Sequence, residues 1–93
     1  MKDLGELPKG KYIEAVLVIY GPRRNTAIYG VVATSNRSKL GLLKWYSPWR
    51  KYCFFPEDGT VFDARCLKQI AEWITELNKR HKERLLELKG GAK

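Results

Sequence analysis

The chain has 93 residues, of which 18 are Lys or Arg and 10 are Asp or Glu, so its formal net charge at pH 7 is +8. A chain of this length forms one domain with a small core, and the excess of positive charge indicates a polyanionic partner. The competing interpretation is a protein that is basic and soluble with no such partner, because net charge constrains association and not fold.

No segment of the sequence indicates a membrane span or an export signal. Residues 1–8 lack an apolar signal-peptide region, and no apolar run is long enough for a transmembrane helix. We therefore expect an intracellular, cytoplasmic protein that holds Cys53 and Cys66 as reduced thiols. These cysteines and the single His81 lack the spacing of a zinc site. We expect neither a metal nor a cofactor.

Four β-rich runs occupy the first part of the chain, at residues 12–20, 26–34, 40–46 and 52–56. Each run is rich in β-branched, aromatic or other apolar residues, and turn-forming residues separate the runs. This order predicts a meander of four antiparallel strands.

A long helix is predicted after Asp63, whose carboxylate is placed to cap the first turn. Its apolar stripe consists of Leu67, Ile70, Ala71, Ile74 and Leu77. We expect the helix to stop at Gly90-Gly91 and its second half to project beyond the sheet. Three leucines would then need a partner, which predicts a homodimer or another protein contact at Leu85, Leu86 and Leu88.

The predicted fold class is α+β: a four-stranded antiparallel β-meander followed by one long C-terminal α-helix packed on one sheet face. Residues 1–11 would form an N-terminal arm, residues 12–89 the single domain and residues 90–93 a flexible tail. One helix covers only one face of the sheet, so the other face is left for a partner.

Residues 40–56 hold six aromatic and three cationic side chains, which combine stacking planes with charges that neutralise phosphates. Strand alternation assigns one set of side chains to the core: Leu43, Trp45, Cys53 and Phe55. It assigns another set to the exposed face: Lys44, Tyr46, Tyr52 and Phe54, joined there by Tyr12 and Tyr20 of the first strand. We further expect Phe62 and Trp73 in the core. For Tyr46, Trp49 and Tyr52, core packing is the competing interpretation.

The nucleic-acid-binding residues predicted on this basis are Arg23, Arg24, Arg37, Lys39, Lys44, Tyr46, Trp49, Arg50, Lys51 and Tyr52. The cations would neutralise phosphates, and Tyr46, Trp49 and Tyr52 would stack bases.

Several short strings carry a resemblance to known proteins: Leu40-Gly41, Lys44-Trp45-Tyr46, Pro48-Trp49-Arg50, the run from Tyr52 to Pro56, Thr60-Val61-Phe62 and Cys66-Leu67. Over residues 39–77 the chain resembles a small family of phage and prophage proteins, which implies a viral or mobile-element origin and no catalytic activity. The order of four antiparallel strands and one helix is also similar to single-stranded-DNA-binding domains of the transcriptional-coactivator and Whirly type, which dimerise through the helix.

An enzyme is not indicated. Glu57 and Asp58 lie in a predicted turn and Asp63 at the helix cap, where structural roles account for them. His81 falls on a charged helix that we expect to be solvated, with no nucleophile patterned around it. The predicted function is therefore binding of single-stranded DNA or RNA with low sequence specificity. The alternative is a phage-encoded module that binds a host or defence protein.

Overall fold

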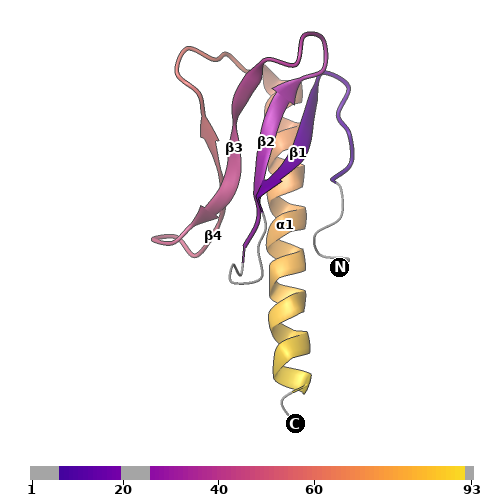
Figure 1. The fold of residues 1–93 in the computed structure, drawn as a ribbon, viewed down its shortest axis with the longest axis vertical. Coiled ribbons are helices and arrows are strands. Elements are labelled where there is room, and N and C mark those ends of the chain that lie inside the picture. The colour runs from indigo at the N-terminus through magenta and orange to yellow at the C-terminus, as the bar shows by residue number, and fades with distance from the viewer. Residues whose placement is uncertain (1–6, 20–25, 92–93) are drawn as a thin grey trace.

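The computed structural model describes residues 7–19 and 26–91. Its elements are β1 (Ile13–Ile19), β2 (Ile28–Ala33), β3 (Lys39–Tyr46), β4 (Lys51–Pro56) and α1 (Ala64–Gly91). The strands form one antiparallel sheet in the order β1-β2-β3-β4, and α1 packs against one face of it (Figure 1). The predicted α+β fold, a four-stranded meander followed by one long helix, is confirmed.

The register of β4 differs from the expected one. Tyr46 pairs with Lys51 across the four-residue turn, so odd-numbered residues of β3 lie opposite even-numbered residues of β4. Residues that pair across an antiparallel ladder share a face of the sheet. Trp45 therefore shares its face with Tyr52, and Leu43 shares its face with Phe54.

This register corrects the predicted faces of β4. Tyr52 and Phe54 lie on the helix side, where Tyr52 is buried and Phe54 packs against the core. Phe55 lies on the open face, opposite Leu42, and its expected place in the core is wrong. Cys53 lies on the same open face, opposite Lys44. The alternation within each run was predicted correctly. The register across the four-residue turn, however, exchanges the two predicted faces of β4.

The core lies between α1 and the covered face of the sheet. Trp73, Tyr29, Leu43 and Val31 are the largest fully buried side chains. Trp45 and Phe62 are partly buried against this cluster. The prediction that Trp73 belongs to the core is confirmed, and the predicted core residues Phe62 and Trp45 lie at its edge.

The helix begins as predicted. The Asp63 carboxylate accepts a hydrogen bond from the backbone N–H of Cys66 at 3.0 Å, which lowers the pKa of Asp63 and satisfies one of the free amides of the first turn. The helix ends later than predicted, because α1 includes Gly90 and Gly91.

The buried stripe of α1 is rotated from the predicted one. Its fully buried members are Ile70, Trp73 and Leu77, whereas Leu67 is half exposed and Ala71 is exposed. The rotation follows from Trp73, the largest side chain of the stripe, which takes the centre of the interface.

The described part of the N-terminal arm packs on the domain. Leu7 is buried, and the Pro8 carbonyl accepts a hydrogen bond of 2.7 Å from the indole Nε1 of Trp73. This bond satisfies the one polar atom of a tryptophan that is otherwise enclosed by apolar side chains.

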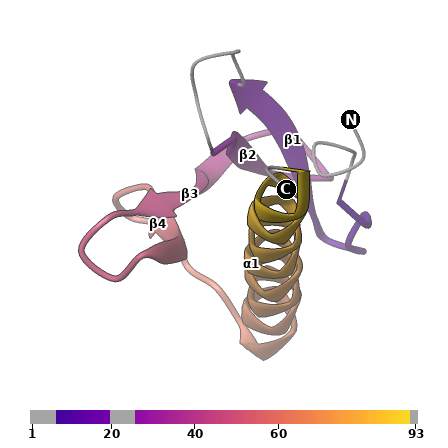
Figure 2. The same cartoon turned by 90° about the horizontal axis from the view of Figure 1, so that it is seen from below.

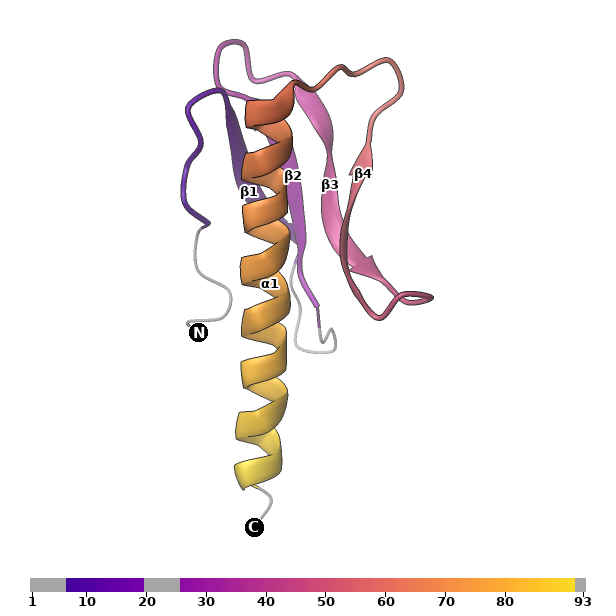
Figure 3. The same cartoon turned by 180° about the vertical axis from the view of Figure 1, so that it is seen from behind.

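The C-terminal half of α1 extends past the sheet, as Figures 1 and 3 show. A helix of 28 residues is about 42 Å long, whereas the longest strand has eight residues and spans about 27 Å. Leu85 and Leu86 lie on the projecting half and are exposed. The side chain of Leu88 is outside the part that the structure describes.

Seen from below, the sheet curves around one side of α1, and no described element covers its other face (Figure 2). This open face is largely apolar. Its described side chains include Val16, Val18, Ile28, Val32, Leu42, Tyr46 and Phe55.

Within the described ranges, no helix is long and apolar enough to cross a membrane.

Candidate nucleic-acid interface

An aromatic row, formed by Phe55, Tyr46 and Trp49, lies on the open face at the β3–β4 end of the sheet. Tyr46 meets Phe55 edge to face with ring centroids 5.9 Å apart, and Trp49 meets Tyr46 in the same way at 5.1 Å. The Lys44 ammonium lies over the Phe55 ring, 4.6 Å from its centroid. Trp49 is 64% exposed at the other end of the row, so a ring of large area is presented to solvent.

The β3–β4 turn sends its side chains to two sides of the hairpin. The backbone N–H of Arg50 donates to the Tyr46 carbonyl at 2.9 Å, and Arg50 adopts a left-handed conformation with φ 54°. That conformation is uncommon for a residue with a Cβ. Trp49 contacts Tyr46 of the open face, whereas Arg50 lines a hollow on the helix side.

The basic hollow lies between this turn and the projecting half of α1, with a volume of about 430 Å³. Its lining consists of Trp45, Arg50, Lys51, Asn78, His81, Lys82 and Leu85. Lys51 pairs with Tyr46 of the open face as well as lining the hollow, so it lies at the rim between the two surfaces. No ion pair joins Arg50, Lys51 or Lys82 to any carboxylate of the described residues.

Hydrogen bonds from Asn78 and Tyr52 hold the wall of the hollow in place. The Asn78 side-chain oxygen accepts from the backbone N–H of Tyr52 at 2.8 Å, which ties α1 to β4. The Tyr52 hydroxyl accepts from the backbone N–H of Ala27 at 3.0 Å, and the residue is 5% exposed. Tyr52 is a core residue, and its predicted exposure as a base-stacking side chain is wrong.

His81 is partly buried in the hollow, although the helix around it is largely exposed as expected. Its imidazole packs on Trp45 with ring centroids 4.5 Å apart and approaches the Tyr52 ring at 6.4 Å. Burial, and secondarily the Arg84 guanidinium, lower the pKa of His81 below its usual value. The imidazole is therefore neutral at pH 7.

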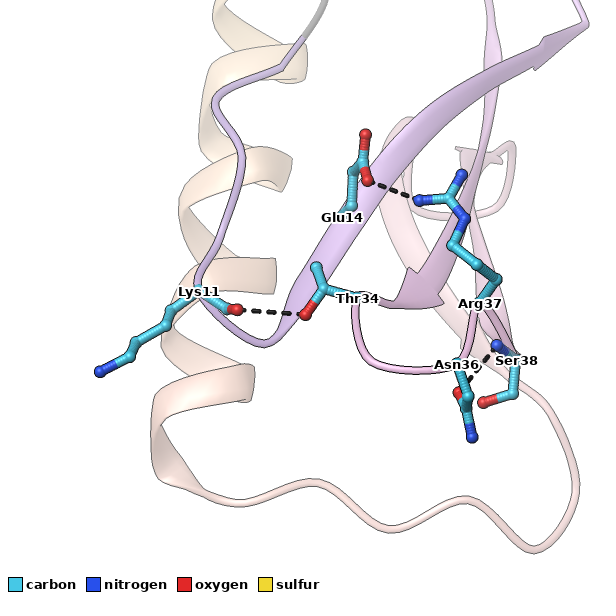
Figure 4. Close-up of polar contacts among 6 residues, drawn as sticks. All are labelled: Lys11, Glu14, Thr34, Asn36, Arg37 and Ser38. Atoms are coloured by element: carbon cyan, nitrogen blue, oxygen red, sulfur yellow. Dashed lines mark hydrogen bonds and ion pairs between the residues drawn. The ribbon is translucent and has the colours of Figure 1, made fainter.

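Two predicted cations lie at the other end of β3 and are already paired. Arg37 donates to the Glu14 carboxylate at 2.7 Å, as Figure 4 shows, and Lys39 lies 3.6 Å from a carboxylate oxygen of Glu57. These side chains are far along the sheet from the β3–β4 turn. Arg23 and Arg24 lie outside the described residues.

The structure divides five of the predicted site residues between two surfaces. Lys44, Tyr46 and Trp49 lie on the open face, Arg50 lies on the helix side, and Lys51 lies at the rim between them. The sequence analysis missed the contribution of α1. Asn78, His81, Lys82 and Leu85 follow the i, i+3, i+4, i+7 spacing of one helix face, so the signal was present. It was assigned to a solvated surface because the contact with Trp45 was unknown.

Neither cysteine is disulfide-bonded. Both are free, with Cys53 on the open face and Cys66 against the core. Burial and the nearby Asp63 carboxylate raise the pKa of the Cys66 thiol, which favours its protonated form. Among the residues that the structure covers, no group of three or more His, Cys, Asp or Glu side chains is placed to hold a metal ion.

Comparison with known proteins identifies a relative among phage proteins. No family model matches the chain, and no solved structure matches it. An uncharacterized 9.3 kDa protein of Acholeplasma phage L2 is 30% identical over 73 residues, which are 78% of this chain and 92% of the phage protein. The chain therefore belongs to the same small family of phage proteins as this 9.3 kDa protein.

Proposed function

We propose that this protein binds single-stranded nucleic acid through the β3–β4 end of its sheet, with low sequence specificity and without catalysis or a cofactor. The observation that carries the proposal is the exposed Trp49 ring, supported edge-on by Tyr46 and followed directly by Arg50 and Lys51. The open face offers rings on which bases can stack and Lys44 beside them, and Lys51 at its rim and Arg50 behind it can neutralise phosphates of the same strand.

Low specificity follows from the chemistry of this surface. Every base has a π-face, so stacking on Trp49 or Tyr46 discriminates little between bases. The aromatic row itself presents rings and the aliphatic stem of Lys44, with no amide side chain among its members to read a base edge. As a phage protein, it would meet such strands in the cytoplasm of the host cell.

Salt dependence tests the proposal directly. A surface that neutralises about four phosphates of a single strand gives a plot of log affinity against log salt with a slope near −3. Fluorescence anisotropy measures the affinity at each salt concentration, with a labelled oligothymidylate as the single strand and its duplex form as the comparison. Lys51→Gln should make the slope shallower by about 0.7, whereas Lys68→Gln, near the opposite end of α1, should leave it unchanged.

The stacking contribution is separable from the charge. Trp49→Ala should weaken single-strand binding by roughly 1 to 3 kcal/mol while leaving the salt slope unchanged. Val61→Ala is the matched control, because Val61 is 91% exposed and lies outside both surfaces. Equal affinities of these two variants would contradict a role for Trp49.

A protein partner of the host or its defence systems is the second candidate function. It is favoured by one observation, the exposed apolar side chains Val16 and Val18 on the open face. If the intact protein binds no oligonucleotide at low salt, the positive charge is a solubility feature and this second function is the one to pursue.

We also propose that the protein is a homodimer in which the projecting halves of α1 pair across a two-fold axis. Leu85 and Leu86 are exposed on that half; Leu85 also lines the basic hollow, so Leu86 is the residue on which the contact mainly depends. A two-fold contact lets the same apolar patch on each copy cover the other.

Sedimentation velocity measures this assembly. We expect a dimer at micromolar concentration that Leu86→Lys converts to a monomer, since burying two lysine charges against each other is unfavourable. Leu67→Lys is the control, because Leu67 is comparably exposed on the half of α1 that lies over the sheet. A monomeric wild-type protein would refute the dimer.

A further inference from the structure

The lining of the basic hollow has an unbalanced charge. Arg50 and Lys51 approach it from the β3–β4 turn, and Lys82 approaches it from α1. No Asp or Glu appears among the described residues that line it. Mutual repulsion among three cations is unfavourable unless an anion binds between them.

The hollow also has an apolar wall and a fixed polar group. Trp45 and Leu85 supply flat and aliphatic surface, and Asn78 is held in place by its bond to the backbone of Tyr52. A volume of about 430 Å³ falls within the range of roughly 300–1,000 Å³ that is typical of small-ligand sites. The hollow thus offers an anion site beside a surface suited to a planar ring.

We infer that the basic hollow binds the phosphate monoester of a nucleotide, with His81 taking up a proton as the phosphate enters. The monoester is either a free mononucleotide or the 5′ end of a strand. Binding of a strand's 5′ end rests on the proposed function, whereas binding of a free mononucleotide does not. A monoester carries nearly two negative charges at neutral pH, against one for each backbone phosphate, and so matches a cluster of three cations more closely.

The protonation state of His81 reports the binding of the phosphate in the hollow. Among the described residues, the charged side chains that line the hollow with His81 are all cationic, namely Arg50 and Lys51 of the β3–β4 turn and Lys82 of α1, and the Arg84 guanidinium acts on it from α1. Trp45 and Tyr52, which pack on its ring, are neutral. No described group near it favours the imidazolium, so a bound dianion changes its protonation more than any other local event would.

The chain contains one histidine, so its ring resonances can be followed in a proton NMR titration without assignment ambiguity. We expect saturating thymidine 5′-monophosphate to raise the pKa of His81 by about one, and thymidine, which lacks the phosphate, to leave it unchanged. Lys82→Gln should remove most of that rise, and Lys68→Gln should preserve it. Identical titration curves with the monophosphate and with thymidine would overturn the inference.

Oligonucleotides distinguish the two sources of the monoester. If strand ends are the ligand, a 5′-phosphorylated oligothymidylate should bind about tenfold more tightly than its 5′-hydroxyl form, and Lys82→Gln should abolish the difference. Equal affinities would refute the strand-end ligand while leaving single-strand binding intact. A His81 response to the mononucleotide with no binding of either oligonucleotide would support the hollow and refute the proposed function.

Discussion

Replacing Trp73 with alanine is expected to lower the free energy of unfolding by about 3 to 5 kcal/mol. Trp73 is 1% exposed at the centre of the helix–sheet interface, where the core side chains Tyr29, Val31 and Leu43 are also enclosed. The substitution removes the whole indole and leaves a cavity that a sheet held by three ladders cannot fill by collapse. Since a domain of this size has a total stability of roughly 5 to 15 kcal/mol, this loss is a large part of it.

Thermal unfolding followed by circular dichroism measures the effect, with an expected fall in melting temperature of about 15 °C or more. Trp73→Phe is the informative comparison. It keeps most of the apolar volume but removes the Nε1–H that donates to Pro8, so its cost should be smaller and should report the tie between the N-terminal arm and the helix. An unshifted melting curve for Trp73→Ala would mean that α1 is rotated away from this position.

The element order was predictable because each element has a local signal. Asp63 stands where a cap is required and does accept the Cys66 amide. The β-rich runs are separated by turn residues, and their spacing leaves a meander as the simplest pairing. The helix was located by its apolar period. Of the predicted stripe, Ile70, Ile74 and Leu77 do pack in or against the core, whereas Leu67 and Ala71 lie outside it.

The face of β4 was not predictable from alternation alone. Which alternate residues of β4 share a face with those of β3 depends on the residues that pair across the turn. That register is set by the turn conformation. Here Arg50 adopts a left-handed conformation that closes the turn and pairs Tyr46 with Lys51. An arginine gives no sequence signal for such a conformation, unlike glycine or asparagine.

The same inversion decides which aromatic residues are available to a ligand. Tyr52 is turned inward and bonded to Ala27, whereas Phe55 is turned outward beside Lys44 and Tyr46. Composition singled out residues 40–56 as the candidate interface, but only the ladder shows which side chains meet there. The role of His81 depends on a contact with Trp45, 36 positions away in the sequence, for which no local pattern exists.

Gly41 holds the register of β3 against β4 through close packing. A Cβ at this position would lie 2.5 Å from the Phe55 carbonyl oxygen and 2.7 Å from two atoms of the Phe54 ring. Gly41 thus lets the Phe54 ring lie against the backbone of β3. Phe54 lies on the covered face together with Tyr52, whose neighbour Lys51 lies at the rim of the basic hollow.

Gly41→Ala is therefore expected to destabilise the domain by about 1 to 3 kcal/mol, because the new methyl group overlaps a backbone atom that cannot move without breaking the ladder. Gly30→Ala is the matched control in the neighbouring strand, where a Cβ meets a Val18 methyl group at 3.2 Å that can turn aside. That control should be neutral or slightly stabilising, since alanine restricts the unfolded chain more than glycine does. Chemical denaturation measures both variants, and equal midpoints would show that β4 does not depend on Gly41. Single-strand binding should be measured for the same two variants. If Gly41→Ala weakens binding as well as stability and Gly30→Ala changes neither, then the cations of the β3–β4 turn depend on the register of β4.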